Sequence, residues 1–163
     1  MYIKQLFALV FSLTVLCSLA NAQAFFQVTG VVGTPLKLNE ADIAKMNKTS
    51  VTLTDKDGKD HNYTGVPVLD LLNRAGVTTG KQLHGENLTK YVLVKCADGY
   101  AVLFSLAELD SALSKKMIIL ATEADNKPIP EGKGPFRLVV PGEGRPARSC
   151  FQVVEFIVKF AKD

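Results

Sequence analysis

The order of short β-rich runs and turn residues along the chain constrains the fold more than any other feature. Runs of four to ten apolar and β-branched residues alternate with turns rich in glycine, proline and aspartate. Such spacing is typical of antiparallel or mixed sheets. The runs that predict strands are residues 25–33, 51–54, 91–96, 101–104, 117–121, 136–140 and 151–160, and the chain after the turn at 55–59 is predicted to be extended through Tyr63.

Turn and helix signals complete the expected fold. Segments 55–59 and 97–100 each contain Asp-Gly, which tolerates the positive φ of a tight hairpin turn. Asn39 is a good N-cap, and Gly76 is typical of a helix C-terminus. The predicted helices cover residues 39–46, 67–76 and 106–113. The fold class is therefore predicted to be α+β: one domain of mainly antiparallel or mixed β-sheets with a few short helices.

Residues 1–22 have the pattern of a secretory signal peptide. Lys4 gives the positively charged n-region, and the apolar run over residues 6–19 is too short to span a bilayer. Small residues at the end of the segment favour cleavage after Ala22. We therefore expect a periplasmic or secreted protein with one mature domain over residues 23–163.

Charge and histidine placement argue against two classes of function. The mature chain has a net charge of about +2 and scattered basic residues, which excludes the basic stripe of a nucleic-acid binder. His61 and His84 are isolated in sequence, and a lone histidine in a polar turn is more often solvated than a ligand. We expect no metal site and no nucleic-acid partner.

Cys96 and Cys150 are the two cysteines that follow the leader segment. In an oxidising compartment they can form one disulfide. They can equally be buried thiols that pack as small hydrophobic side chains. Both alternatives stay open at this point.

Four blocks of sequence carry a resemblance that covers nearly the whole mature chain. They are "YTGVPVLDLLNRAG", "ADGYAVLFSLAELD", "GPFRLVVPGEGRPAR" and "VVEFIV". Together, in this order and spacing, they resemble the molybdopterin-binding domain of the sulfite oxidase family. The resemblance implies that family's domain fold and a cleft that accepts a pterin.

One departure from the family pattern bears on activity. In catalytic members a cysteine thiolate ligates molybdenum from the strand upstream of the "YTGVPV" block. Residues 51–54 read "VTLT" here, no cysteine lies between Cys17 and Cys96, and threonine cannot replace a soft thiolate. The resemblance then points to a pterin-binding protein without molybdenum catalysis that reports its ligand to a membrane-bound signalling partner. The alternatives are a molybdopterin-dependent oxidoreductase and an interaction domain with an empty cleft.

The block "ADGYAVLFSLAELD" holds three candidate ligand-binding residues. A pterin is a flat aromatic ring with donors and acceptors along one edge, so a binder needs a stacking group and a polar partner. Tyr100 and Phe104 are four residues apart on a predicted strand, which places them on one face, and Asp98 lies in the adjacent turn. The competing interpretations are that Phe104 is core and that Asp98 only supports the turn.

The resemblance adds three further candidates, Arg145, Arg148 and Ser149, from the loop that lies at the cofactor in the oxidases. Prolines at both ends stiffen this loop, so it presents its cations at little entropic cost. The competing interpretation is that one arginine pairs with Glu143 or Glu155 and only holds the loop in place.

Overall fold

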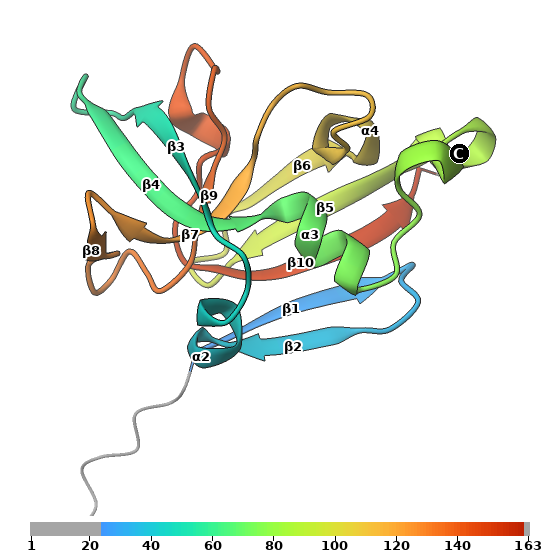
Figure 1. Ribbon diagram of the computed structural model, residues 1–163, viewed down its shortest axis with the longest axis horizontal. Coiled ribbons are helices and arrows are strands. Elements are labelled where there is room, and N and C mark those ends of the chain that lie inside the picture. The colour runs from blue at the N-terminus through green and yellow to red at the C-terminus, as the bar shows by residue number, and fades with distance from the viewer. Residues whose placement is uncertain (1–23, 162–163) are drawn as a thin grey trace, which may run out of the picture.

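Two β-sheets carry the fold of this protein, for which the computed structural model describes residues 24–161 (Figure 1). The strands are β1 (Phe25–Gly30), β2 (Leu36–Asn39), β3 (Thr49–Thr54), β4 (Asp60–Pro67), β5 (Lys90–Cys96), β6 (Ala101–Ser105), β7 (Ile119–Ala124), β8 (Lys127–Pro128), β9 (Arg137–Val139) and β10 (Val153–Phe160). The α-helices among these residues are α2 (Glu40–Ala44), α3 (Val68–Arg74) and α4 (Leu106–Leu109). The predicted signal segment lies outside the described residues.

The first sheet has the strand order β2-β1-β10-β5-β6, and the second has β3-β4-β7-β8 with β9 also paired to β7. Every pairing is antiparallel except that of β1 with β10, which is parallel. The α+β prediction with mainly antiparallel or mixed sheets is confirmed. The short strands β2 and β8 were not predicted. Between residues 24 and 161, the helices are all too short or too polar to cross a bilayer.

Local signals place several elements where the sequence indicates. Asn39 caps α2 in a reciprocal pair: its Oδ1 accepts from the Asp42 amide at 2.8 Å, and an Asp42 carboxylate oxygen accepts from the Asn39 amide at 3.0 Å. Gly58 has φ of +75° in the turn between β3 and β4, and Gly76 has φ of +69° after α3. Both glycines do what their turn chemistry predicts.

Two predicted boundaries are wrong for reasons outside the local pattern. The strand predicted over residues 25–33 ends at Gly30, where φ reaches +90°. The helix predicted over residues 106–113 is only α4, because Asp110 has extended backbone. The Asp110 carboxylate is buried and accepts from the amide of Gly80 at 2.5 Å, so a long-range contact ends this helix.

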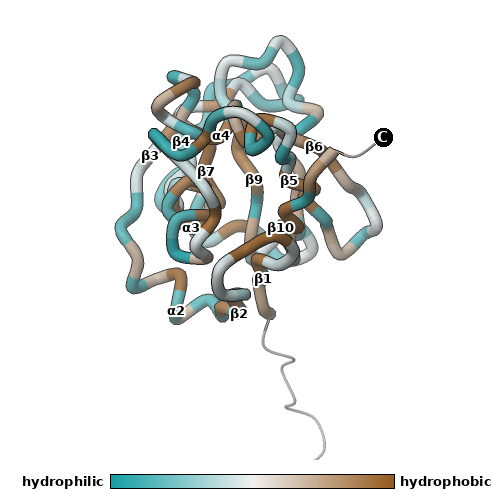
Figure 2. Tube along the Cα trace, turned by 90° about the vertical axis from the view of Figure 1, so that its right-hand side faces the viewer, coloured by the Kyte–Doolittle hydropathy of each residue, from teal (hydrophilic) through white to brown (hydrophobic). Residues whose placement is uncertain are grey.

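The main core lies between the first sheet, α3 and one face of the second sheet. Phe26 packs edge-on against Phe156 and Phe136, with ring centroids 4.8 and 6.1 Å apart. Figure 2 shows hydrophobic residues concentrated along the central strands. A second, smaller apolar cluster covers the other face of the second sheet. Its members are Leu53, Tyr63, Ile119, Ala121, Ile129 and Val139.

Gly65 tests how closely β4 and β7 approach. A Cβ at this position would lie 2.1 Å from the carbonyl oxygen of Leu120, and backbone cannot yield as a flexible side chain can. We expect Gly65→Ala to lower the free energy of unfolding by about 3 kcal/mol or more in urea denaturation. Gly144→Ala is the matched control, since no atom lies within 4 Å of its added methyl group. Equal stability of the two variants would contradict this packing.

Candidate functional site

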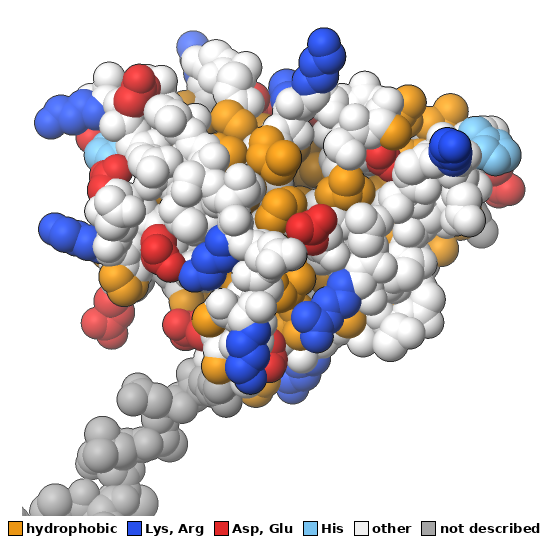
Figure 3. Space-filling model, viewed as in Figure 1, with side chains coloured by type: hydrophobic (Ala, Val, Ile, Leu, Met, Phe, Trp, Pro, Cys, Tyr) orange, Lys and Arg blue, Asp and Glu red, His pale blue; other side chains and the backbone are white. Residues whose placement is uncertain are grey.

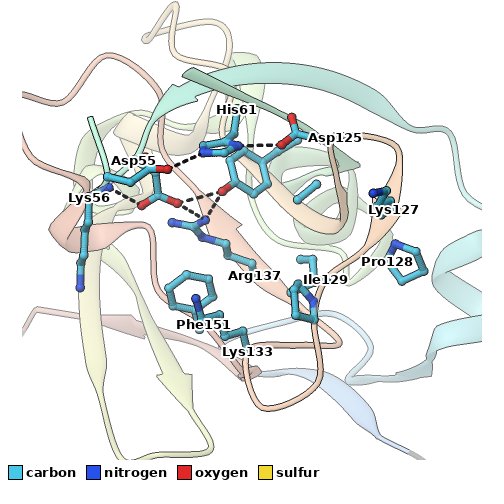
Figure 4. Close-up of a pocket in the computed structure, with 14 residues that line it drawn as sticks. Asp55, Lys56, His61, Asp125, Lys127, Pro128, Ile129, Lys133, Arg137 and Phe151 are labelled. Atoms are coloured by element: carbon cyan, nitrogen blue, oxygen red, sulfur yellow. Dashed lines mark hydrogen bonds and ion pairs between the residues drawn. The ribbon is translucent and has the colours of Figure 1, made fainter. Parts of the chain in front are cut away.

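A pocket of about 550 Å³ opens beside the β3–β4 hairpin, the β7–β8 turn and the segment that precedes β10 (Figure 4). Figure 3 shows side chains of both charges gathered at this end of the molecule. The pocket is lined by four basic and three acidic side chains: Lys56, Lys127, Lys133, Arg137, Asp55, Asp57 and Asp125. This density of charge beside an apolar cluster marks it as a candidate binding site.

Arg137 forms the floor of the pocket and is only 2% exposed. Alternation along β9 puts its side chain on the same face as Val139, over the smaller apolar cluster. Across the sheet, Arg137 is opposite Ala121, which is in turn opposite Gly65. These two small residues leave room for a guanidinium where larger side chains would fill the face.

Asp55, Tyr63 and Phe151 hold the Arg137 guanidinium in place. Nη1 donates to Asp55 Oδ2 at 2.7 Å and also to the Tyr63 hydroxyl, which itself donates to Asp55 at 2.9 Å. The guanidinium carbon lies 4.7 Å from the centroid of the Tyr63 ring and 4.0 Å from that of Phe151. The charge is therefore neutralised by one carboxylate and flanked by two aromatic rings.

These contacts shift the acidity of both oxygen-bearing partners. The hydrogen bond from Arg137 outweighs burial and holds the pKa of Asp55 well below its ordinary value. Burial, together with the hydrogen bond to Asp55, raises the pKa of Tyr63 to about 12. At neutral pH Asp55 is thus ionised and Tyr63 is protonated, which is the state that their hydrogen bonds require.

One donor of Arg137 stays unused. Its Nε is buried and has no hydrogen-bond partner, and every hydrogen bond that Arg137 makes to the described residues comes from Nη1. An unmade hydrogen bond at a buried donor is costly, so such groups are rare unless a ligand or water completes them. A ligand acceptor that reached the buried Nε of Arg137 would complete this hydrogen bond.

His61 lies at the rim of the pocket between two carboxylates. Its Nδ1 is 2.6 Å from Asp125 and its Nε2 is 3.1 Å from Asp57. The hydrogen bond to Asp125, then the one to Asp57, raises the pKa of His61 above its ordinary value. Sequence reasoning did not predict these two hydrogen bonds of His61, because the carboxylates come from two different turns. With both nitrogens occupied, His61 bridges those turns, and protonation of the ring makes both contacts ion pairs.

The β7–β8 turn presents Asp125 to the histidine. Asp125 and Asn126 both have positive φ, 51° and 60°, as a two-residue type I′ hairpin requires. The Asp125 carboxylate also accepts from the amide of Asn62 at 2.9 Å, and its own amide donates to the Asn62 carbonyl at 2.8 Å. Turn chemistry therefore positions an acidic side chain at the pocket rim.

The predicted arginine loop forms a separate cluster. Arg148 pairs with Glu143 and with Glu108 at 3.1 Å, and its guanidinium carbon lies 4.2 Å from the centroid of the Phe104 ring. Pairing of an arginine with Glu143 was one of the two interpretations of this loop. Phe104 is fully buried in the main core, so the structure does not form the expected wall of two accessible rings with Tyr100.

The other predicted site residues are spread over the same region. Asp98 accepts from the Tyr100 amide at 2.9 Å, which is turn chemistry, and the Tyr100 hydroxyl donates to the Ala147 carbonyl at 3.0 Å. Ser149 is buried and its Oγ accepts from the amide of Val140 at 3.0 Å. Arg145 is exposed. Among the described residues, the pocket lining includes none of the six predicted ligand contacts.

Cys96 and Cys150 are free, buried thiols, and they are hydrogen-bonded to one another. Neither cysteine lines the pocket.

Comparison with family models identifies most of the chain. Residues 16–145 match the family described as the oxidoreductase molybdopterin binding domain. The chain belongs to this family. The resemblance to the sulfite oxidase family is thereby confirmed. No curated protein matches this chain.

A solved structure shares the fold of this molybdopterin-binding domain. The sulfane dehydrogenase SoxCD from Paracoccus pantotrophus matches with a TM-score of 0.66 and 19% sequence identity. The match covers 86% of this chain and 39% of that one. The domain therefore spans well under half of the chain to which it is similar.

The residues of the pocket fit the organic part of a molybdopterin. An unpaired guanidinium nitrogen, two aromatic rings and three lysines suit a flat heterocycle with an anionic substituent. They do not supply the thiolate that molybdenum takes from its protein in the catalytic members. Within residues 24–161, no cluster of histidine, cysteine and carboxylate side chains has the arrangement of a metal site.

Sequence reasoning missed the residues that build this pocket. Arg137 lies inside a quoted block, in the apolar run 136–140, and a lone arginine between buried strand residues is the signal that identifies it. Asp55 was assigned only to its turn. Arg145 and Arg148 of the neighbouring loop were predicted instead, because the family resemblance implies that this loop lies at the cofactor.

The His61 bridge predicts a pH-dependent contribution to stability. Because the folded-state pKa of His61 is raised, its contribution is complete below the unfolded value of about 6.5 and is lost as pH rises through the folded pKa. We expect His61→Gln to lower Tm most near about pH 5.5 and least near about pH 8.5. His84→Gln, at an exposed histidine, is the control. A Tm difference for His61→Gln that does not change with pH would contradict the bridge.

Proposed function

We propose that this molybdopterin-binding domain binds a pterin in the Arg137 pocket and does not carry out molybdenum catalysis. The observation that supports this most is the buried guanidinium of Arg137, which lines the pocket beside two aromatic rings and whose Nε has no hydrogen-bond partner among the described residues. A donor held in this way is preorganised for a ligand that brings its own acceptor.

The chemistry of a pterin suits this donor. The O4 carbonyl oxygen and the N5 ring nitrogen of an oxidised pterin are two acceptors side by side. One edge of a guanidinium can donate to such a pair. Asp55 already neutralises Arg137, so this arginine acts as an oriented donor more than as surplus positive charge. Lys127 and Lys133 also line the pocket and offer charge to an acidic substituent on the ring.

Among residues 24–161, no cysteine lines this pocket, which supports binding without a protein-ligated metal. Molybdenum held by such a cofactor would supply two-electron redox chemistry. In place of a cysteine thiolate, this pocket has the Asp55 carboxylate. That carboxylate is a hard oxygen donor, and it is already hydrogen-bonded to Arg137 and Tyr63. We infer that the domain uses the family's fold to hold a free pterin.

The remaining parts of the proposal rest on the sequence. The leader pattern of residues 1–22 supports a periplasmic or secreted location. The resemblance to short secreted relatives supports a membrane-bound signalling partner that responds to the pterin-loaded domain. In this proposal the domain is a ligand carrier, and the downstream signal is generated by that partner.

Fluorescence titration with an oxidised, 6-substituted pterin tests the proposal. The chain contains no tryptophan, so pterin emission is followed with little interference from the protein. We expect the double variant Asp55→Asn/Arg137→Gln to weaken binding by roughly 10- to 100-fold, since it removes a charge-assisted donor. The paired change neutralises both charges at once, so it avoids leaving one buried charge alone. Lys81→Ala, at an exposed lysine outside the pocket, should bind like the parent protein.

Arg148→Ala separates the pocket from the loop as the binding site. If the pterin occupies the Arg137 pocket, Arg148→Ala retains affinity. If the ligand contacts the loop instead, Arg148→Ala loses affinity and the double variant does not. Failure of the parent protein to bind any pterin, or recovery of stoichiometric molybdenum with the purified protein, would overturn the proposed function.

A further inference from the structure

The two buried cysteines lie side by side at the junction of β5 and β10. Cys96 ends β5 and is opposite Val153 in the ladder, and the adjacent amide of Ala97 donates to the Gln152 carbonyl at 2.9 Å. Cys150 lies three residues before Val153, and its side chain interacts with that of Cys96. The side chains are 6% and 5% exposed and belong to the same core cluster.

Cys150 is also joined to the wall of the pocket. Its carbonyl accepts from the Leu138 amide at 2.9 Å, which ties it to the strand that carries Arg137. The next residue, Phe151, lines the pocket, and its ring centroid lies 4.0 Å from the Arg137 guanidinium carbon. Any bond formed at Cys150 therefore acts on backbone that positions both the floor and the wall of the pocket.

We propose that Cys96 and Cys150 are a redox pair, which a small-molecule or protein disulfide oxidises to an intramolecular disulfide that fixes the wall of the pocket. The pair is a modification site whose co-reactant is a disulfide of the glutathione class. This inference is independent of pterin binding, because the thiol chemistry requires no ligand.

The exchange proceeds in two balanced steps. The Cys96 thiolate attacks one sulfur of the donor disulfide, so a mixed disulfide forms and the first donor thiolate leaves. The Cys150 sulfur then attacks the Cys96 sulfur of the mixed disulfide, and the second donor thiolate leaves. Two protein thiol protons pass to the two released thiolates, and the donor accepts the two electrons.

The surroundings of Cys96 and Cys150 indicate which thiol attacks the donor disulfide first. The hydrogen bond from Cys150 lowers the pKa of Cys96, while the same contact and burial hold the pKa of Cys150 well above its ordinary value. The thiolate is the nucleophile in disulfide exchange, so Cys96 attacks first. Because both side chains are almost fully buried, the exchange takes place during folding or local opening.

Refolding of the full chain in glutathione buffers tests the proposal. The chain carries Cys17→Ser so that only the two core thiols are counted. Reduced, unfolded protein is refolded with oxidised or with reduced glutathione, then alkylated in denaturant and weighed. We expect the oxidised sample to lose about 2 Da and to take up no alkyl groups, whereas the reduced sample takes up two.

The disulfide should also change the folded protein. It closes a loop of roughly 54 residues, so Tm should rise by roughly 10 °C over the reduced form. Hydrogen exchange over residues 150–152 should slow, as expected for a fixed pocket wall. Cys96→Ser and Cys150→Ser should both lack the redox-dependent shift in Tm.

Three results would overturn the redox pair. One is uptake of two alkyl groups after oxidative refolding. Another is a disulfide-linked dimer in place of the 2 Da loss within one chain. The third is an oxidised protein whose Tm and exchange over residues 150–152 equal those of the reduced protein. None of these results depends on whether the chain binds a pterin, so failure here is distinct from failure of the proposed function.

Discussion

The ion pair between Arg137 and Asp55 organises one whole end of the molecule. A guanidinium that is 2% exposed is stable only with a partner, and the partner lies 82 residues earlier in the chain. Meeting this requirement brings the end of β3 against β9 and draws the Tyr63 hydroxyl into the same network. The pocket forms where the turn between β3 and β4 brings Asp55 to the Arg137 guanidinium on the face of the second sheet.

The two faces of the second sheet have separate tasks. One face contributes to the main core, where Leu120 and Leu138 pack with the first sheet. On the other face, Gly65 and Ala121 are too small to fill the surface, and the polar network of Arg137 occupies the space they leave. Stability rests largely on the first face, so the second can hold an unpaired donor without endangering the fold.

Sequence reasoning succeeded where structure is local. Asn39 caps its helix and Gly58 turns its hairpin because each acts on backbone within a few residues. The parallel pairing of β1 with β10 and the ion pair of Arg137 could not be predicted, since both depend on register between distant segments. The buried Asp110 shortened a predicted helix for the same reason. Family resemblance supplied the fold, but it pointed to the exposed Arg145 and the half-buried Arg148 before the buried Arg137.

The two arginines differ in what they leave for a ligand. All three side-chain nitrogens of Arg148 are engaged: Nε and Nη2 by Glu143, Nη2 by Glu108 and Nη1 by the Leu103 carbonyl. A ligand at Arg148 would first have to displace carboxylates. Arg137 uses only Nη1 and keeps a buried Nε unpaired, so a ligand acceptor there replaces nothing. Folding has already removed water from the Arg137 guanidinium. A hydrogen bond from this guanidinium to a ligand acceptor therefore does not carry the free-energy cost of desolvating the arginine.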